Sequence, residues 1–211
     1  MMTTMVNGAA PRRRISDEHV ELLRVRGIPI ELAEAAGLES ADATVASKLL
    51  GYPNPCSSGG LGIPYPGTHP TYWRIRMDRG SSRYLCPKGR PVPVYLPPPY
   101  EATCADDITN SLVVVEAPLK ALAMAAAGLN AVALGGVATT LDAGALNATW
   151  APLGVRGRDV RILFDANRAT NENVRAAETR LVSALERAGA VVRICSLPLT
   201  DLAATRGPTT I

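Results

Sequence analysis

Residues 111–136 read SLVVVEAPLKALAMAAAGLNAVALGG, and this stretch decides the fold class. Its two apolar runs enclose a segment that starts with proline and is closed by glycine, residues that favour a helix start and a helix end. The same order recurs in VRILFDA (160–166), an amphipathic helix around 173–188, and VVRICSL (191–197). Near-continuous apolar strands that alternate with helices are typical of a parallel sheet covered on both faces. The predicted fold is therefore α/β, with a parallel sheet of four or five strands.

The composition is that of a folded chain without zinc sites or membrane spans. The 211 residues are 47% hydrophobic and carry a net charge of +3, so the chain is long enough to bury a core. Its four cysteines show no C-x-x-C spacing and it has two histidines, so we expect no zinc. The start has no apolar signal region, and no apolar run approaches the roughly 20 residues of a membrane span. We expect a cytoplasmic protein with reduced thiols and no membrane partner.

Changes in composition along the chain suggest the domain boundaries. Residues 51–100 hold 11 of the 17 prolines, seven of the nine aromatic residues, six basic residues and one acid. We therefore predict five segments: a flexible N-terminus (1–15), a helical hairpin region (16–50), a basic Pro/Gly-rich β subdomain (51–100), an α/β domain (108–200) and a C-terminal tail (201–211).

The N-terminal region has the signals of two short helices joined by a turn over residues 16–37. A serine can cap the first helix, and a proline opens the second. A DNA-reading helix-turn-helix is one interpretation, yet the second helix offers Glu31 and Glu34 where a groove reader needs Arg, Lys, Asn or Gln. A small helical hairpin that docks on the rest of the chain is the favoured interpretation.

The β subdomain carries a basic face. Short β-like runs separated by Gly, Pro and Ser over 61–96 predict a small, strongly twisted antiparallel sheet. In TYWRIRM (71–77), strand alternation puts Arg74 and Arg76 on one face and apolar residues on the other. Guanidinium groups bind phosphates bidentately and tyrosine rings stack on unpaired bases, so we predict nucleic-acid binding; a merely solvated face is the alternative. The predicted binding residues are Arg74, Arg76, Arg79, Arg83, Lys88 and Arg90.

Two acids follow strands of the predicted parallel sheet. Glu116 ends one strand and Asp165 another, and ligands of such sheets gather at the carboxyl edge. If the strands are neighbours, the two carboxylates repel unless a cation lies between them, which suits Mg²⁺ or Mn²⁺. Lys120 is placed to meet a phosphate, and Gly135 and Gly136 allow close backbone approach. Taken singly, each residue also fits an ordinary role in capping, solvation or a turn.

At these residues the chain resembles the TOPRIM family, the metal-dependent catalytic domain of bacterial-type primases, topoisomerases and several nucleases. The similar segments are VVVEAPLKALAMAAAGLNAVALGG (113–136) and ILFDANRATNENVRAAETRLVSALERAGAVVRI (162–194). Over about residues 16–207 the chain is more closely similar to a TOPRIM-like domain of unknown function in replication proteins of plasmids, phages and integrative elements. There it is often joined to a helicase or polymerase module. The resemblance implies a TOPRIM-like parallel-core sheet flanked by helices.

The resemblance also implies roles for single residues. Glu116 becomes the general acid/base or a metal ligand, and Asp165 becomes a Mg²⁺ ligand. Lys120, which its place one turn into the helix brings near the same phosphate, is the second predicted catalytic residue. Asn167 stands at the second Asp position of the family, which lowers the charge of the site and favours one ion over two. Arg168 beside it could hold phosphate directly. Ala117 replaces a common glycine, which puts the tight turn after Glu116 in doubt.

The leading hypothesis is a primase-like enzyme of a mobile element that performs Mg-dependent phosphoryl transfer on single-stranded DNA or a primer-template. The alternative is a catalytically weakened DNA-binding adaptor that recruits a helicase or polymerase. A weaker third hypothesis is an α/β protein that binds a nucleotide or small phosphate without DNA. DNA or RNA as substrate, and synthesis or cleavage as reaction, stay open at this point.

Overall fold

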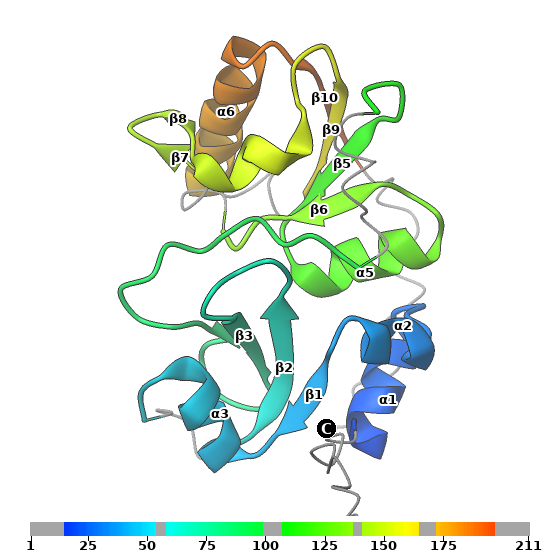
Figure 1. Cartoon of the computed structure of the whole chain (residues 1–211), viewed down its shortest axis with the longest axis vertical. Helices are drawn as coiled ribbons and strands as arrows, with labels where there is room; N and C mark the ends of the chain where they lie inside the picture. The colour runs from blue at the N-terminus through cyan, green and yellow to red at the C-terminus, as the bar shows by residue number, and fades with distance from the viewer. Residues whose placement is uncertain (1–14, 54–57, 99–106, 137–140, 165–171, 197–211) are drawn as a thin grey trace, which may run out of the picture.

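A four-stranded parallel sheet forms one half of the molecule, in the order β10–β9–β5–β6 (Figure 1). The computed structural model describes residues 15–53, 58–98, 107–136, 141–164 and 172–196. The four strands are β5 (Leu112–Val115), β6 (Ala131–Ala133), β9 (Asp159–Leu163) and β10 (Val191–Cys195). The four apolar runs of the sequence therefore form the parallel sheet that their pattern predicts.

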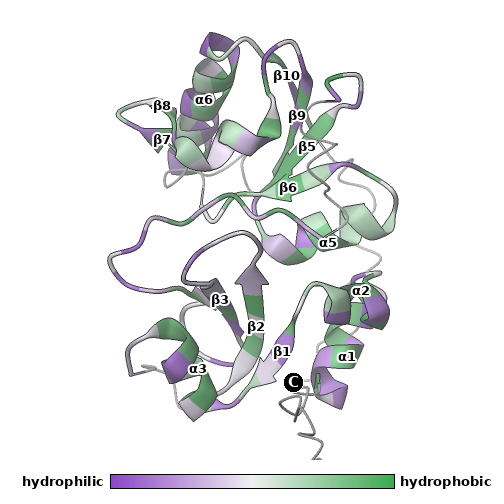
Figure 2. Ribbon diagram, viewed as in Figure 1, coloured by the Kyte–Doolittle hydropathy of each residue, from purple (hydrophilic) through white to green (hydrophobic). Residues whose placement is uncertain are grey.

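Helices cover the sheet on both faces because its strands are apolar on both. Leu112 and Val114 pack in a cluster with Leu181 and Leu185 of α6 (Glu172–Arg187). Val115 points the other way, into a second cluster that contains α5 (Pro118–Ala126). Figure 2 shows the hydrophobic colour running along β5 and β6, with hydrophilic residues on α6. This alternation is the period-two pattern of a strand that is buried on both sides.

An antiparallel sheet forms the other half of the molecule, in the order β1–β2–β3–β4. Its strands are β1 (Glu39–Ala41), β2 (Gly60–Tyr65), β3 (Tyr72–Met77) and β4 (Tyr84–Leu85). The helix α3 (Ala43–Leu50) packs on one face, where Ala46 and Leu50 contact a cluster with Ile75 and Met77 of β3. The predicted twisted antiparallel β subdomain is present, with β1 as a strand that the sequence pattern did not predict.

The helical hairpin consists of α1 (Asp17–Arg24) and α2 (Ile30–Ala35). Ser16 caps α1 by accepting a hydrogen bond from the His19 backbone, and Gly27 has a φ of 68°, which favours glycine. Residues of the hairpin share a buried cluster with Leu119 and Leu122 of α5. The hairpin therefore docks on the α/β half of the molecule (Figure 1).

One β-like run lies elsewhere than predicted. VPVYL (92–96) was expected in the antiparallel sheet, but Tyr95 makes an isolated antiparallel bridge to Ala133 of β6. The backbone N–H of each residue donates to the carbonyl of the other, at 2.8 and 3.0 Å. The run contains Pro93 and is flanked by Pro91 and Pro97, none of which can donate to a ladder, so its sequence permits a single bridge at an open sheet edge.

Smaller elements complete the described part of the chain. β7 (Leu141–Asp142) and β8 (Ala145–Leu146) form a two-stranded hairpin, and η2 (Ala148–Leu153) is a 3₁₀ helix whose Trp150 and Leu153 join the α6 cluster. Within the described residues, no helix combines the length and the apolarity that crossing a membrane requires.

Gly135 follows β6 where the chain passes close to Val92, and a β-carbon there would overlap the valine side chain. We predict that Gly135→Ala destabilises the protein by about 1–3 kcal/mol, the usual range for overpacking. The double variant Gly135→Ala/Val92→Ala should recover part of this loss, because truncation of the valine makes room for the new methyl group. Thermal unfolding of the two single variants and the double variant measures both effects, and equal or greater loss in the double variant would contradict the packing explanation.

Candidate functional site

A cleft of about 510 Å³ lies between the arginine-bearing face of β3 and the start of α5. It is open to solvent and sits at the carboxyl edge of β5, where ligands of parallel sheets gather. Its charged lining residues are Arg26, Arg74, Arg76, Arg83, Lys120 and Glu116, accompanied by Tyr84. The structure thus places three of the predicted nucleic-acid-binding residues opposite the two predicted catalytic residues.

Glu116 follows β5 directly and leads into the N-terminus of α5. One of its carboxylate oxygens, Oε2, accepts a hydrogen bond from Lys120 Nζ at 3.1 Å, one helical turn further on. The two side chains are 24% and 37% exposed. Ala117 caps α5 with φ −135° and ψ 143°, an extended conformation that any residue adopts, so the turn after Glu116 does not need glycine.

The strands that carry the two predicted acids are neighbours. β5 and β9 pair in parallel, with Val114 opposite Ile162. Continuing that register brings the end of β5 at Glu116 beside the end of β9 at Phe164. Asp165, Asn167 and Arg168, the other predicted site residues, lie outside the described residues. Their roles remain predictions from the sequence.

Arg74 is a partly buried arginine of the cleft. Its guanidinium lies 4.5 Å from the centre of the Tyr84 ring, a cation–π contact. Two of its nitrogens, Nε and Nη1, are buried, and neither has a hydrogen-bond partner in the described part of the chain. Burial raises the pKa of Tyr65 to about 12, and the nearby positive charge of Arg74 opposes that rise. The guanidinium of Arg74 is therefore held beside two tyrosines, Tyr65 and Tyr84.

Arg26 is the site residue that sequence reasoning missed. It lies in the turn after α1, and its Nη1 donates to the Leu22 carbonyl at 2.9 Å. The pKa of Arg26 is lowered mainly by burial, and the positive charges of Arg76 and Arg83 lower it further. In the sequence, a basic residue after a helix is an ordinary partner of the helix dipole, so only the folded chain reveals that Arg26 reaches the cleft.

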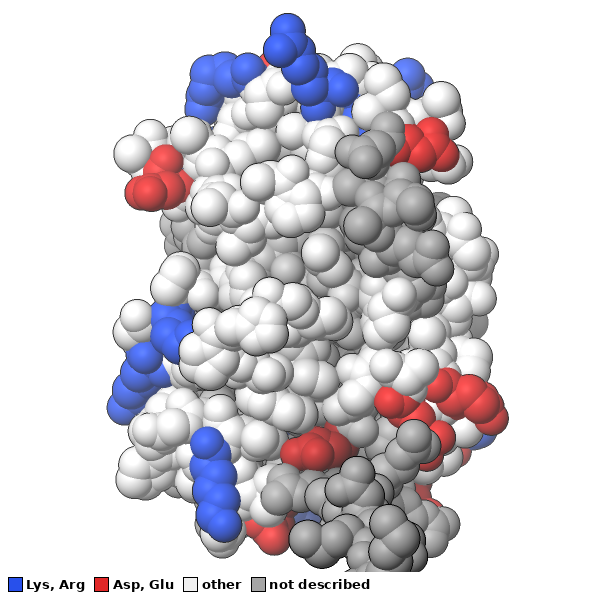
Figure 3. Space-filling view, in the orientation of Figure 1, with Lys and Arg blue, Asp and Glu red and all other residues white. Residues whose placement is uncertain are grey.

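The other three predicted nucleic-acid-binding residues lie away from the cleft lining. The Lys88 ammonium sits over the Tyr52 ring at 4.6 Å, and the Arg90 guanidinium sits 5.3 Å from the Tyr72 ring and donates to the Pro70 carbonyl. Arg79 is exposed. Charged side chains on the face drawn in Figure 3 lie apart around its margins. On this face, therefore, basic side chains do not gather as they do in the cleft.

The two glycines after β6 were predicted to admit a ligand. Gly135 lies against Val92, so packing within the chain already accounts for the absence of a side chain there. Gly136 has a φ of 148°, a conformation that favours glycine. A role of either residue in ligand approach stays a prediction.

The electrostatics of the cleft favour a polyanion. Five cationic side chains face a single carboxylate among the described lining residues. Like charges that share a partly desolvated site raise its energy until counter-charge arrives, and arginine forks match phosphate oxygens in shape and charge. A ligand with several phosphate groups would neutralise the positive charge and would offer oxygens to the arginine side chains.

The described residues supply one oxygen ligand for a divalent cation. Among the described residues, no group of three or more His, Cys, Asp or Glu side chains could hold a metal. Glu116 alone provides a half-buried carboxylate at the sheet edge, a hard oxygen donor of the kind that Mg²⁺ prefers. The residue fits a cation, and the further ligands would have to come from outside the described residues.

Comparison with known proteins identifies the fold. A family profile, "Domain of unknown function (DUF3854)", matches residues 102–204. The structure of the Aquifex aeolicus primase (zinc-binding and RNA polymerase domains) is similar with a TM-score of 0.60 and 20% identity, over 87% of this chain and 50% of that chain. The DnaG catalytic core is similar with a TM-score of 0.59 and 19% identity, over 89% of this chain and 66% of that chain. The DnaG primase catalytic domain bound to ssDNA is similar with a TM-score of 0.58 and 18% identity, over 94% of this chain and 69% of that chain.

The fold is that of the catalytic core of primases, a TOPRIM-like α/β fold. At these identities the likeness concerns the fold alone. The chain spans half to about two thirds of the length of these structures. No curated protein matches the sequence.

The crowding of arginines leads to a prediction for the ligand-free protein. Arg76→Gln removes one of the charges that lower the pKa of Arg26, so it should stabilise the fold. The cleft is open to solvent, which limits the gain to below about 1 kcal/mol. Thermal unfolding at low salt should show the gain, and 0.5 M NaCl should abolish it through screening. Arg24→Gln is the matched control, because Arg24 is paired with Glu21 on the exposed side of α1. A destabilised Arg76→Gln variant at low salt would refute repulsion in the cleft.

Proposed function

We propose that this chain is a primase-type nucleic-acid protein that holds single-stranded DNA in the cleft and performs phosphoryl transfer beside Glu116. The observation that carries the proposal is the cleft itself, in which Arg74, Arg76 and Arg83 face the end of β5. The fold supports it, and one structure with this fold is described as bound to ssDNA.

The residues of the cleft divide the work between binding and chemistry. The arginines would bind backbone phosphates, and the Tyr84 ring offers a surface for an unpaired base. Lys120 would place its positive charge next to the reacting phosphate, at the N-terminal end of α5. Glu116 would serve as general acid/base or as a metal ligand.

The proposal includes one bound Mg²⁺ or Mn²⁺. Glu116 would hold it together with Asp165 and the amide oxygen of Asn167. When bound, such an ion supplies positive charge that stabilises a phosphoryl group in transfer. We further propose that the chain acts in replication of a mobile element such as a plasmid or phage, beside a helicase or polymerase.

A second candidate is a DNA-binding adaptor with little or no catalysis. The Glu116–Lys120 ion pair favours it, because the described carboxylate of the site already has a cation of its own chain beside it. Such a module would bind DNA through the same arginines without requiring a metal.

Binding and catalysis can be tested on the same variants. The full chain is incubated with a fluorescent single-stranded DNA, nucleotides and Mg²⁺ or Mn²⁺, and binding is measured separately in EDTA. Arg83→Gln should weaken binding and lower the slope of log affinity against log salt by about 0.7, the value for one lost contact with single-stranded phosphate. Glu116→Gln should keep the affinity in EDTA but lose product by at least about 10²-fold.

Arg24→Gln controls for the loss of any arginine, because Arg24 lies on the exposed side of α1. DNA binding without product, even with Asn167→Asp, would favour the adaptor over the enzyme. No DNA affinity at low salt would refute both.

The ion pair at Glu116 makes a separate prediction about metal. Lys120→Ala removes the ammonium that pairs with Glu116 Oε2, so Mn²⁺ should bind more tightly, by up to about fivefold, since a partly exposed ion pair is worth up to about 1 kcal/mol. Calorimetric titration of the DNA-free protein with Mn²⁺ measures this change. Lys120→Arg keeps the charge and should stay near the wild-type affinity. Weaker Mn²⁺ binding in Lys120→Ala would show that the lysine does not compete with the ion.

A further inference from the structure

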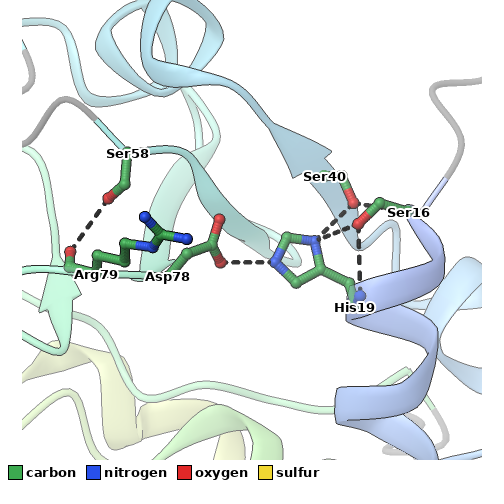
Figure 4. A network of polar contacts seen from close by, with 6 residues as sticks. All are labelled: Ser16, His19, Ser40, Ser58, Asp78 and Arg79. Atoms are coloured by element: carbon green, nitrogen blue, oxygen red, sulfur yellow. Dashed lines mark hydrogen bonds and ion pairs between the residues drawn. The ribbon is translucent and has the colours of Figure 1, made fainter.

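A chain of polar contacts joins α1 to the residue that follows β3 (Figure 4). The His19 side chain, 6% exposed, lies with Nε2 2.8 Å from Asp78 Oδ1. Its other ring nitrogen, Nδ1, lies 2.7 Å from the Ser40 hydroxyl of β1. The Ser40 oxygen also accepts a hydrogen bond from the Ser16 backbone at 2.7 Å. The network thus links the start of α1, the edge strand β1 and the end of β3.

The partners fix the protons of this network. Ionised Asp78 can only accept, so His19 Nε2 carries the proton and donates to it. In the neutral ring Nδ1 is then an acceptor, and the Ser40 hydroxyl donates to it. The Ser40 oxygen is held by the Ser16 N–H and the imidazole is buried, so the Ser–His–Asp order here holds elements together rather than activating a nucleophile.

The network and the cleft both lie between one side of α1 and one side of β3. His19, Leu22 and Arg26 recur at helical spacing, which places them along one side of α1 and its last turn. Arg76 and Asp78 are two residues apart on the same side of β3. A pocket of about 240 Å³ between these surfaces is lined by His19, Leu22, Arg76 and Asp78, together with Glu18, Glu21 and Val25 of the helix side. Arg76 lines both this pocket and the cleft.

The contact between α1 and β3 has like charges at one end and a hydrogen bond at the other. At the cleft end, Arg26 is close enough to Arg76 and Arg83 for their charges to lower its pKa. Repulsion there tends to move the end of α1 away from β3. At the other end, the hydrogen bond between His19 and Asp78 draws α1 toward β3. This bond is only partly buried, yet a hydrogen bond to a charged group is stronger than one between neutral groups, so it can offset the repulsion.

We infer that His19, through Asp78, is a positioning residue that holds Arg26 in the cleft for contact with the DNA backbone. This inference rests on the proposed function of the cleft. Neither His19 nor Asp78 would touch the ligand. Their contribution to affinity would pass through Arg26, whose distance from Arg76 and Arg83 they determine.

A double-mutant cycle on the full chain tests the inference. Affinity for a fluorescein-labelled single-stranded DNA is measured in EDTA for wild type, Asp78→Ala, Arg26→Ala and the double variant. Arg26→Ala should weaken binding about tenfold, the loss of one charged phosphate contact. Asp78→Ala should weaken it about three- to tenfold alone and add less than about twofold in the Arg26→Ala background, because the two act on one contact.

A conservative variant separates positioning from general damage. Asp78→Asn keeps an oxygen that accepts from His19, so its affinity should stay within about threefold of wild type. Arg24→Gln, on the exposed side of the same helix, should bind DNA like wild type. If Asp78→Ala does not fold, Ser40→Ala replaces it in the cycle, because the Ser40 hydroxyl contacts His19 Nδ1 and accepts the Ser16 N–H, both within the same network. Independent, additive losses for Asp78 and Arg26 would overturn the inference, as would equal losses in Asp78→Asn and Asp78→Ala.

Hydrogen exchange of the DNA-free protein distinguishes failure of this inference from failure of the proposed function. The amides of Arg26, Gly27 and Ile28 donate to carbonyls of α1 and report on the end of that helix. Asp78→Ala should raise their exchange rates by at least about tenfold and leave β5 unchanged. Faster exchange in a protein that does not bind DNA would uphold the positioning contact and reject the proposed function. Unchanged exchange in a protein that binds DNA would reject the positioning contact alone.

Discussion

The packing of the antiparallel sheet against the edge of the parallel sheet is the interaction on which the site depends. Three buried tyrosines meet there: Tyr65 stacks edge-on against Tyr72 and Tyr95, with ring centroids 5.1 and 5.0 Å apart. Tyr65 and Tyr72 belong to β2 and β3, and Tyr95 is bridged to β6. Edge-to-face rings of this size bury much apolar area in a defined geometry. The contact therefore sets the two sheets in one arrangement.

That arrangement explains why the arginines of β3 face a carboxylate rather than bulk water. Tyr72 and Arg74 lie on the same side of β3, so burying the tyrosine against the other half turns the arginine toward α5. The result is a cleft with far more positive than negative charge, and Arg26 adds to it from the helical hairpin. Such a site is unfavourable when empty of anions and favourable when it holds them. The proposed binding of DNA phosphates would relieve this repulsion.

The carboxylate at the sheet edge is already paired within the chain. Lys120 pairs with Glu116 within the first turn of α5, and Ala117 occupies the turn without strain. The edge carboxylate therefore has a cation supplied by the chain itself. The ion pair is partly exposed, so its free energy is small and an incoming ligand can rearrange it. The His19–Asp78 contact belongs to the opposite side of the cleft, where it joins the helical hairpin to the arginine-bearing strand.

The sequence by itself determined the parallel sheet, its helices and the hairpin, because hydrophobic period, helix caps and Gly/Pro breaks act over short stretches of chain. It also pointed to Glu116, whereas the pairing of β5 with β9, two strands that are not consecutive in the chain, was decided by the tertiary structure. Only the tertiary structure decided which basic residues meet that acid. Arg74, Arg76 and Arg83 line the cleft with Glu116, whereas Lys88 and Arg90 contact tyrosine rings elsewhere. Arg26 also lines the cleft, although nothing in the sequence around it indicates a binding residue. Contacts between distant segments depend on how whole elements pack, and local patterns carry no information about that packing.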